Sequence, residues 1–222
     1  MRRPDSVATH ERHLSNAFED GWRARHSGAI APDQMESPMI VHINGYPGVG
    51  KLTIGAALAE LIGGKLVDNH GIYNVAFALT EFKSPAFYDT VRAVQNIAYK
   101  RVLDLPAETP VILTNWYSQN LVWGNENWNA VIALARRRGS ALNNVLLTCS
   151  PDENERRIKN KGRAAKRKPR NPEMVNDNRA GRALLDRGGD RTLRLDVTNL
   201  LANAAAQEIA EWLNLARGPA VV

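Results

Sequence analysis

The chain has 222 residues, a length typical of one domain or of one domain with an appended segment, and this excludes a long multi-domain machine. With 44% hydrophobic and 23% charged residues it can form a core, so global disorder is excluded. The net charge is +6, most of which falls within residues 151–191, and the single cysteine excludes an internal disulfide and a cysteine-based zinc pattern.

Residues 1–38 are predicted to form an N-terminal extension. A helical pattern over residues 9–26 is followed by a stretch rich in helix breakers, and the helix spaces three large apolar side chains four residues apart, Leu14, Phe18 and Trp22. The extension is either flexible or a helix that docks on the domain. A start at Met35, with residues 1–34 outside the natural protein, is a further interpretation.

The sequence also favours a cytoplasmic protein with no membrane span. No apolar run approaches the length of about 18 residues that a membrane helix needs. The N-terminal segment lacks the apolar block of a signal peptide, and its acidic residues argue against an organelle transit peptide.

From Met39 onward, short apolar runs alternate with longer amphipathic ones, which is typical of strand–helix units around a parallel sheet. We therefore predict an α/β domain over residues 39–222. The predicted strands are 40–44, 65–68, 111–115, 144–149 and 192–197. The predicted helices are 51–62, 71–82, 85–104, 125–138, 152–162, 172–186 and 202–216.

A glycine-rich motif lies directly after the first predicted strand and directly before a helix. Glycines allow backbone N–H groups to turn inward around a phosphate, and the N-terminus of the next helix favours its negative charge. The lysine that follows reaches the outer phosphates. The motif predicts a nucleotide phosphate site formed by Gly45, Tyr46, Pro47, Gly48, Val49, Gly50, Lys51, Leu52 and Thr53, hereafter the phosphate loop.

The position in this loop that usually supplies a hydroxyl to the metal departs from the common pattern. Leu52 stands where a hydroxyl usually meets Mg²⁺, and Thr53 follows one residue later. Thr53 is therefore the candidate hydroxyl for the phosphates or for the metal.

Asp68 ends the second predicted strand, which we expect to adjoin the strand before the phosphate loop. Strand ends of α/β sheets face the ligand crevice, so Asp68 should face the phosphates. It could ligate Mg²⁺, accept a proton from an attacking hydroxyl, or merely cap the next helix. His70 is a candidate substrate contact or base, the alternative being a solvent-facing loop histidine.

The third predicted strand ends in Thr114 and Asn115 rather than in the acid that many phosphate-loop enzymes carry there. Asn115 and Trp116 are candidate substrate contacts at the start of a loop rich in aromatic and amide side chains. The alternative is that the tryptophans only cover the core.

A basic stretch follows the fourth predicted strand and predicts an arginine-rich lid at about residues 156–171. Mobile arginines that close over a triphosphate neutralise the charge on the transferred group and exclude water. The candidates are Arg157, Arg163, Arg167 and Arg170, with Arg179 and Arg182 on the predicted helix beyond.

Together, residues 39–217 resemble the nucleoside-monophosphate-kinase-like branch of phosphate-loop kinases, which includes shikimate kinase, gluconate kinase and chloramphenicol phosphotransferase. The resemblance implies a five-stranded parallel sheet in the order 2-3-1-4-5 between helical layers. It also implies an acceptor-binding region at about residues 71–105 and a nucleotide base beside residues 196–199, with Arg157 stacked on it. The spacing from Lys51 to Asp68 and His70 matches two acids of shikimate kinase, but the second is histidine here, which argues against shikimate as acceptor.

We therefore predict a magnesium-dependent kinase that transfers the γ-phosphoryl group of ATP to a hydroxyl of a small molecule. Lys51, Asp68 and the arginines of the predicted lid would be catalytic, Thr53 and Asp68 would hold the metal, and Arg92 would anchor an anionic acceptor. The acceptor and the oligomeric state, monomer or dimer, stay open.

Two other functions are weighed against this one. A GTP switch is a poor alternative because the segment Asn160–Arg163 ends in arginine where guanine recognition needs an acid. A nucleotide-binding regulatory protein, or a module that meets RNA or DNA through its basic stretch, is the stronger alternative.

Overall fold

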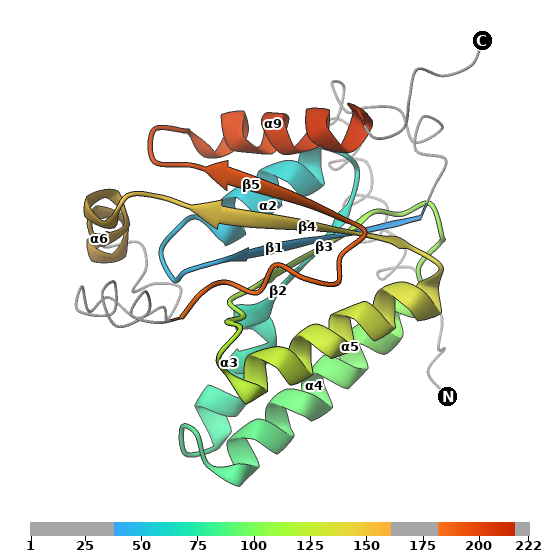
Figure 1. Ribbon diagram of the computed structural model, residues 1–222. Coiled ribbons are helices and arrows are strands. Elements are labelled where there is room, and N and C mark those ends of the chain that lie inside the picture. The colour runs from blue at the N-terminus through green and yellow to red at the C-terminus, as the bar shows by residue number, and fades with distance from the viewer. Residues whose placement is uncertain (1–37, 161–181, 216–222) are drawn as a thin grey trace, which may run out of the picture.

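The computed structural model describes residues 38–160 and 182–215 (Figure 1). Five strands and six helices are described there. The strands are β1 (Met39–Gly45), β2 (Lys65–Asp68), β3 (Val111–Asn115), β4 (Ala141–Thr148) and β5 (Arg191–Asp196). The helices are α2 (Lys51–Leu61), α3 (Asn69–Leu79), α4 (Pro85–Leu103), α5 (Val122–Arg138), α6 (Pro151–Lys159) and α9 (Ala202–Leu215).

The strands form one parallel sheet in the order β2-β3-β1-β4-β5, as predicted. The expectation that β2 adjoins β1 is wrong, because β3 lies between them. Since all strands are parallel, their carboxyl ends lie along one edge of the sheet, which here is followed by the phosphate loop, α3 and α6 (Figure 1).

Helices cover both faces of the sheet (Figure 1). On one face α2 and α9 pack over an apolar cluster that includes Val41, Ile43 and Val145. On the other face α4 and α5 pack over a cluster that includes Ile40, Leu113 and Trp128. The central strands are buried on both faces, which explains why they read as short apolar runs.

Local signals in the sequence set the ends of several helices. Ser84 caps α4 by accepting a hydrogen bond from Phe87 N, and Pro85 follows at the first helical position. Ser150 and Pro151 begin α6 in the same way. Gly139 ends α5 with a φ of 65°, in the left-handed region that glycine tolerates.

The predicted helix 172–186 is wrong where it can be compared. Residues 182–187 are not helical, and Leu184 forms an isolated antiparallel bridge with Ser118. Gln119 N donates to Ala183 O, and Leu185 N donates to Tyr117 O. This segment therefore satisfies its backbone groups by pairing with the loop after β3 instead of with itself.

A buried polar network lies between the central strands. His42 on β1 is fully buried, and its ring nitrogens lie 3.0 Å from Asn144 Oδ1 on β4 and 3.1 Å from Asn115 Oδ1 on β3. A neutral imidazole has one donor and one acceptor nitrogen, so one of the two amides must present its NH₂ group instead. Asn144 is that amide, because its Nδ2 would otherwise be buried without a hydrogen-bond partner, whereas Asn115 Nδ2 already donates to Asn69.

This network should make stability pH-dependent. Burial lowers the pKa of His42 from 6.5 to about 4, so between these pH values only the unfolded chain binds the proton. The contribution of His42 to the free energy of unfolding should therefore fall by about 3 kcal/mol as the pH drops from 6.5 to 4. Urea unfolding at several pH values measures this loss.

The matched variants for that experiment are His42→Gln and His70→Gln. His42→Gln should reduce the pH dependence between 6.5 and 4, whereas His70→Gln, which changes a half-buried residue at the start of α3, should retain it. An unaltered slope in His42→Gln would show that other groups cause the acid loss.

Candidate functional site

The phosphate loop joins the end of β1 to the start of α2. Gly48 and Gly50 have φ values of 92° and 111°, in the left-handed region that side chains other than glycine rarely adopt. Gly50 is also the residue that caps α2. The loop therefore has the alternating backbone conformation that directs successive N–H groups toward one point, at the positive end of a helix.

Lys51 is the first residue of α2, and its ammonium turns back over the loop. Nζ donates to Gly45 O at 2.6 Å and to Tyr46 O at 3.0 Å. These two carbonyls hold the positive charge at the mouth of the loop. An anion bound by the loop amides would thus meet the ammonium as well.

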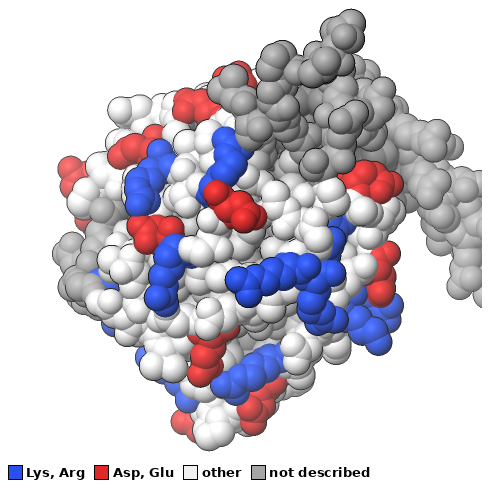
Figure 2. All heavy atoms as spheres, turned by 45° about the vertical axis from the view of Figure 1, so that its right-hand side comes forward, with Lys and Arg blue, Asp and Glu red and all other residues white. Residues whose placement is uncertain are grey.

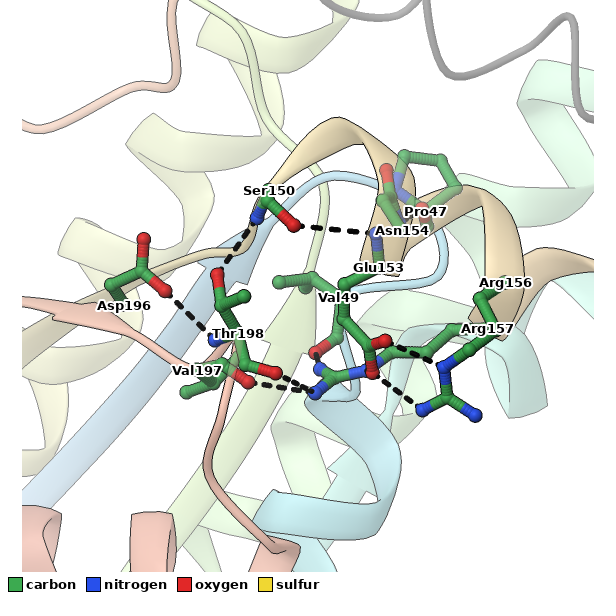
Figure 3. Close-up of polar contacts among 10 residues, drawn as sticks. All are labelled: Pro47, Val49, Ser150, Glu153, Asn154, Arg156, Arg157, Asp196, Val197 and Thr198. Atoms are coloured by element: carbon green, nitrogen blue, oxygen red, sulfur yellow. Dashed lines mark hydrogen bonds and ion pairs between the residues drawn. The ribbon is translucent and has the colours of Figure 1, made fainter.

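Helix α6 supports the phosphate loop from beside it (Figure 3). Asn154 on α6 is 1% exposed, and its Nδ2 donates to Pro47 O at 3.0 Å. A Cβ atom at Gly48 would lie 2.6 Å from both Asn154 Nδ2 and Ile158 Cγ1. Gly48 is therefore required both by its backbone conformation and by the close approach of α6.

Replacing Gly48 by alanine should weaken nucleotide binding strongly. The added methyl group would push the loop away from α6 while forcing a non-glycine residue to a φ of 92°. We expect the Kd for ATP to rise about tenfold or more, measured by calorimetry, from a strain of about 1–3 kcal/mol.

Gly63→Ala is the matched control. Gly63 also has a left-handed φ, of 64°, but it has no atom within 4 Å of its added Cβ and lies after α2. It should lose stability through its left-handed backbone alone, without losing affinity for ATP. Equal affinity of Gly48→Ala and the unchanged protein would contradict this role of the loop.

Arg157 connects the phosphate loop to the segment after β5 (Figure 3). Its Nη1 donates to Val49 O at 2.8 Å, and its Nη2 donates to Val197 O at 2.7 Å. Its Nε donates to Glu153 Oε1 at 2.6 Å. The guanidinium edge is thus held by three elements, which fixes the plane that a nucleotide base could stack on.

Glu153 holds this arginine from one turn earlier in α6. Hydrogen bonds from Arg156, followed by those from Arg157, lower the pKa of the Glu153 carboxyl to about 2. The carboxylate is therefore charged throughout the physiological range and fixes Arg157 permanently.

The segment after β5 is itself tied to the end of β4. Thr198 Oγ1 accepts from Ser150 N at 2.8 Å, and Asp196 Oδ1 accepts from Thr198 N at 2.8 Å (Figure 3). Residues 196–198 thus lie beside α6, next to the phosphate loop, which is where the resemblance predicts the nucleotide base.

Asp68 stands at the carboxyl end of β2, in the position that precedes α3. Its side chain makes no capping hydrogen bond, so Asp68 does not act as a side-chain cap of α3. Instead Oδ1 accepts from Thr114 Oγ1, at the end of β3, at 2.5 Å. The neighbouring strand therefore orients the carboxylate at the edge where the phosphate loop lies.

Asn115 is in the interior rather than at the surface. It is 4% exposed, its Oδ1 faces His42, and its Nδ2 donates to Asn69 Oδ1 at 2.9 Å. The amide therefore connects the buried network to the start of α3. Its observed role is to position Asn69, next to Asp68.

Trp116 is half-buried, and Arg182 contacts both its ring and Tyr46 of the phosphate loop. The Arg182 guanidinium is 5.9 Å from the centre of the Trp116 ring, and Tyr46 OH donates to Arg182 O at 3.0 Å. Trp116 Nε1 is buried without a hydrogen-bond partner among the described residues.

The described residues offer few ligands for a metal ion. Thr53 is exposed on the first turn of α2, and Leu52 beside it is half-buried. Within residues 38–160 and 182–215, no three His, Cys, Asp or Glu side chains come together. Mg²⁺ commonly binds through one or two carboxylates with phosphate and water, and Asp68 and Thr53 fit that hard-oxygen pattern.

Arg92 is not an isolated cation. Its guanidinium lies 3.1 Å from Asp89 Oδ1 and 3.5 Å from Glu126 Oε2, and it covers the ring of Trp123 at 4.9 Å. Two carboxylates therefore offset its charge. His70, at the start of α3, lies against Phe77 with 5.9 Å between ring centres.

Several predicted residues lie outside the described part of the chain. These are Leu14, Phe18 and Trp22 of the extension and Arg163, Arg167, Arg170 and Arg179 of the basic stretch. Among described residues, basic and acidic side chains are interspersed on the face seen in Figure 2. None of the helices in the described ranges has the length and apolar character needed to cross a membrane.

The sequence interpretation missed four residues that shape the site. In the sequence, Thr114 was considered only because it stands where many phosphate-loop enzymes have an acid. Its hydroxyl, at the end of β3, orients Asp68. Glu153 and Asn154 gave no signal, because their contacts depend on how α6 packs against a loop that is distant in sequence. Thr198 likewise acts through a long-range backbone contact.

Comparison with known proteins supports the same architecture. A family model described as "AAA domain" matches residues 41–179. A putative kinase from Chloroflexus aurantiacus is 20% identical, with a TM-score of 0.59, over 82% of this chain and 98% of that one.

Two further solved structures share the fold. A gluconokinase from Sinorhizobium meliloti is 18% identical (TM-score 0.51, over 81% of this chain and 97% of that one). A tunicamycin resistance protein from Deinococcus radiodurans is 19% identical (TM-score 0.51, over 80% and 96%). No curated protein matches the sequence. The predicted resemblance to small phosphate-loop kinases is thereby confirmed for the fold.

Proposed function

This chain belongs to the AAA domain family, and from that premise we propose that it is a kinase that transfers the γ-phosphoryl group of ATP to a hydroxyl of a small molecule. The observation that carries the proposal is the phosphate loop. Its left-handed glycines precede α2, its mouth holds the Lys51 ammonium, and Arg157 connects it to the segment after β5.

We propose that the chain's own residues supply positioning and charge neutralisation, which account for most of the rate in phosphoryl transfer. Backbone N–H groups of the phosphate loop would hold the β- and γ-phosphates, and Lys51 would offset their charge. The plane of Arg157, fixed by Glu153, would support the adenine base. A bound Mg²⁺, held by phosphate oxygens and by Thr53 or Asp68, would neutralise further charge.

Transfer then needs an acceptor hydroxyl in line with the bond that breaks. The acceptor oxygen bonds to the γ-phosphorus, the bond from that phosphorus to the β–γ bridging oxygen breaks, and ADP leaves. We infer that Asp68 takes the hydroxyl proton, because Thr114 orients its carboxylate at the carboxyl edge of the sheet.

Transfer of label tests the proposal. The protein is incubated with γ-labelled ATP, Mg²⁺ and a fractionated metabolite extract, beside its Lys51→Met variant. Label on a small molecule that disappears with the variant supports a kinase and isolates its acceptor. ATP binding without transfer to any fraction would contradict the proposal and favour a regulatory nucleotide-binding protein.

A further inference from the structure

Helices α3, α4 and α5, with the turn between α3 and α4, carry a cluster of aromatic side chains. Neighbouring rings in it have centres 4.7–6.0 Å apart. We call it the aromatic cluster, and its members are Tyr73, Phe77, Phe82, Phe87, Tyr88 and Trp123.

The cluster has a buried base and an exposed surface. Phe87 is 1% exposed beneath the other rings, whereas Phe77 and Phe82 are 46% and 60% exposed. Their ring centres lie 5.7 Å apart, so they present one continuous apolar area. Contiguous exposed rings on a protein surface commonly mark a binding site.

The position of the cluster relates it to the candidate active site. His70 follows Asp68 by two residues and touches the ring of Phe77. Tyr73 OH, one turn further along α3, accepts a hydrogen bond of 2.7 Å from Trp123 Nε1 and thereby joins α3 to α5. The apolar area therefore begins beside the carboxyl edge of the sheet and extends outward from it.

The charged side chains beside Trp123 are already paired with one another. Arg92 lies over Trp123 and contacts both Asp89 and Glu126, so its charge is offset twice. Lys83, at the outer end, lies over the exposed face of Phe82 with Nζ 5.3 Å from the ring centre. An acceptor with a carboxylate would have to compete with Asp89 and Glu126 for Arg92, and one with an amine would have to compete with Arg92 for these two carboxylates.

We propose that the acceptor is an uncharged alcohol that carries an aromatic or alicyclic ring, and that this ring packs on Phe77 and Phe82. The inference rests on the proposed kinase function and names its substrate class. It departs from a sugar-acid acceptor, which would need a cation without a carboxylate partner and hydrogen-bonding groups in place of rings.

Competition against the labelled acceptor of the metabolite extract tests this substrate class. Four compounds are compared as competitors of label transfer: 2-phenylethanol, 3-phenyllactate, phenylalaninol and xylitol. The first three share a phenyl ring and a hydroxyl but are neutral, anionic and cationic, and xylitol is neutral without a ring. We expect 2-phenylethanol to inhibit transfer at a concentration at least about tenfold lower than each of the others.

The double variant Phe77→Ser/Phe82→Ser adds a structural arm to this experiment. Both side chains are exposed, so the fold should survive, while the KM for the labelled acceptor should rise about tenfold with the KM for ATP unchanged. Leu79→Ser is the control, because Leu79 is 77% exposed on the same helix but outside the cluster.

The outcomes separate this inference from the proposed function. Three results would overturn the substrate class: stronger competition by a charged compound or by xylitol, no competition by 2-phenylethanol up to its solubility, or an unchanged KM in the double variant. In each case, transfer that depends on Lys51 would still support the kinase. A dimer that dissociates only in the double variant would show that a second copy covers the rings, and would also overturn it. Absence of transfer to any acceptor would instead refute the kinase itself.

Discussion

Replacing Lys51 by methionine is expected to lower kcat for phosphoryl transfer at least about 100-fold. The ammonium lies at the mouth of the phosphate loop, 2.6 Å from Gly45 O and 3.0 Å from Tyr46 O, where it would meet the charge that develops on the phosphates. Methionine keeps the length and apolar stem of the side chain but removes the charge. The rate is measured with γ-labelled ATP and the acceptor isolated from the extract.

Lys65→Met is the matched control, because Lys65 is exposed at the start of β2, at the opposite edge of the sheet. It should retain full activity. Both variants should unfold at urea concentrations close to that of the unchanged protein, since a part-buried lysine contributes only a few hydrogen bonds. Comparable rates for the two variants would show that Lys51 does not act on the phosphates.

Asp68→Asn is expected to lower kcat about 100-fold or more, with little change in the KM for ATP. The amide keeps the shape of the side chain and can still accept the hydrogen bond from Thr114 Oγ1, but it cannot take a proton. Asp104→Asn, at the exposed end of α4, is the control and should be fully active.

The magnesium dependence of the Asp68 variant separates its two roles. If the carboxylate accepts the proton, the Mg²⁺ concentration for half-maximal rate should be unchanged in Asp68→Asn. If it ligates the metal, that concentration should increase severalfold. A variant that equals the unchanged protein in rate would contradict both roles.

The parts of the molecule that follow local rules could be predicted from the sequence. The phosphate loop was found because its glycines and lysine act through their own backbone and through the helix that follows. The first and last residues of β2 and β3 were predicted correctly because helix- and strand-breaking residues flank their short apolar runs. The capped starts of α4 and α6 follow the same logic.

Contacts between distant segments could not be predicted. Residues 182–186 have a helical pattern, but the loop after β3 offers them backbone partners, and tertiary pairing overrides local propensity. The sequence around Arg92 does not reveal that Glu126 reaches it from α5. Nor does the sequence show that the amide of Asn115 contacts His42 and Asn69. The roles of Arg92 and Asn115 as substrate contacts stay predictions.

The buried network around His42 also bears on how the sheet assembles. A strand that is apolar on both faces fits its neighbours almost equally well after sliding by one residue, because the slide exchanges one apolar side chain for another. Sliding β1 by one residue would place Asn143 or Val145 opposite His42 in place of Asn144, and would turn the imidazole to the other face of the sheet, away from its amide partners. The polar side chains thus specify the register of the central strands. Their contacts raise the free energy of sheets with a shifted register more than they lower the free energy of the native sheet.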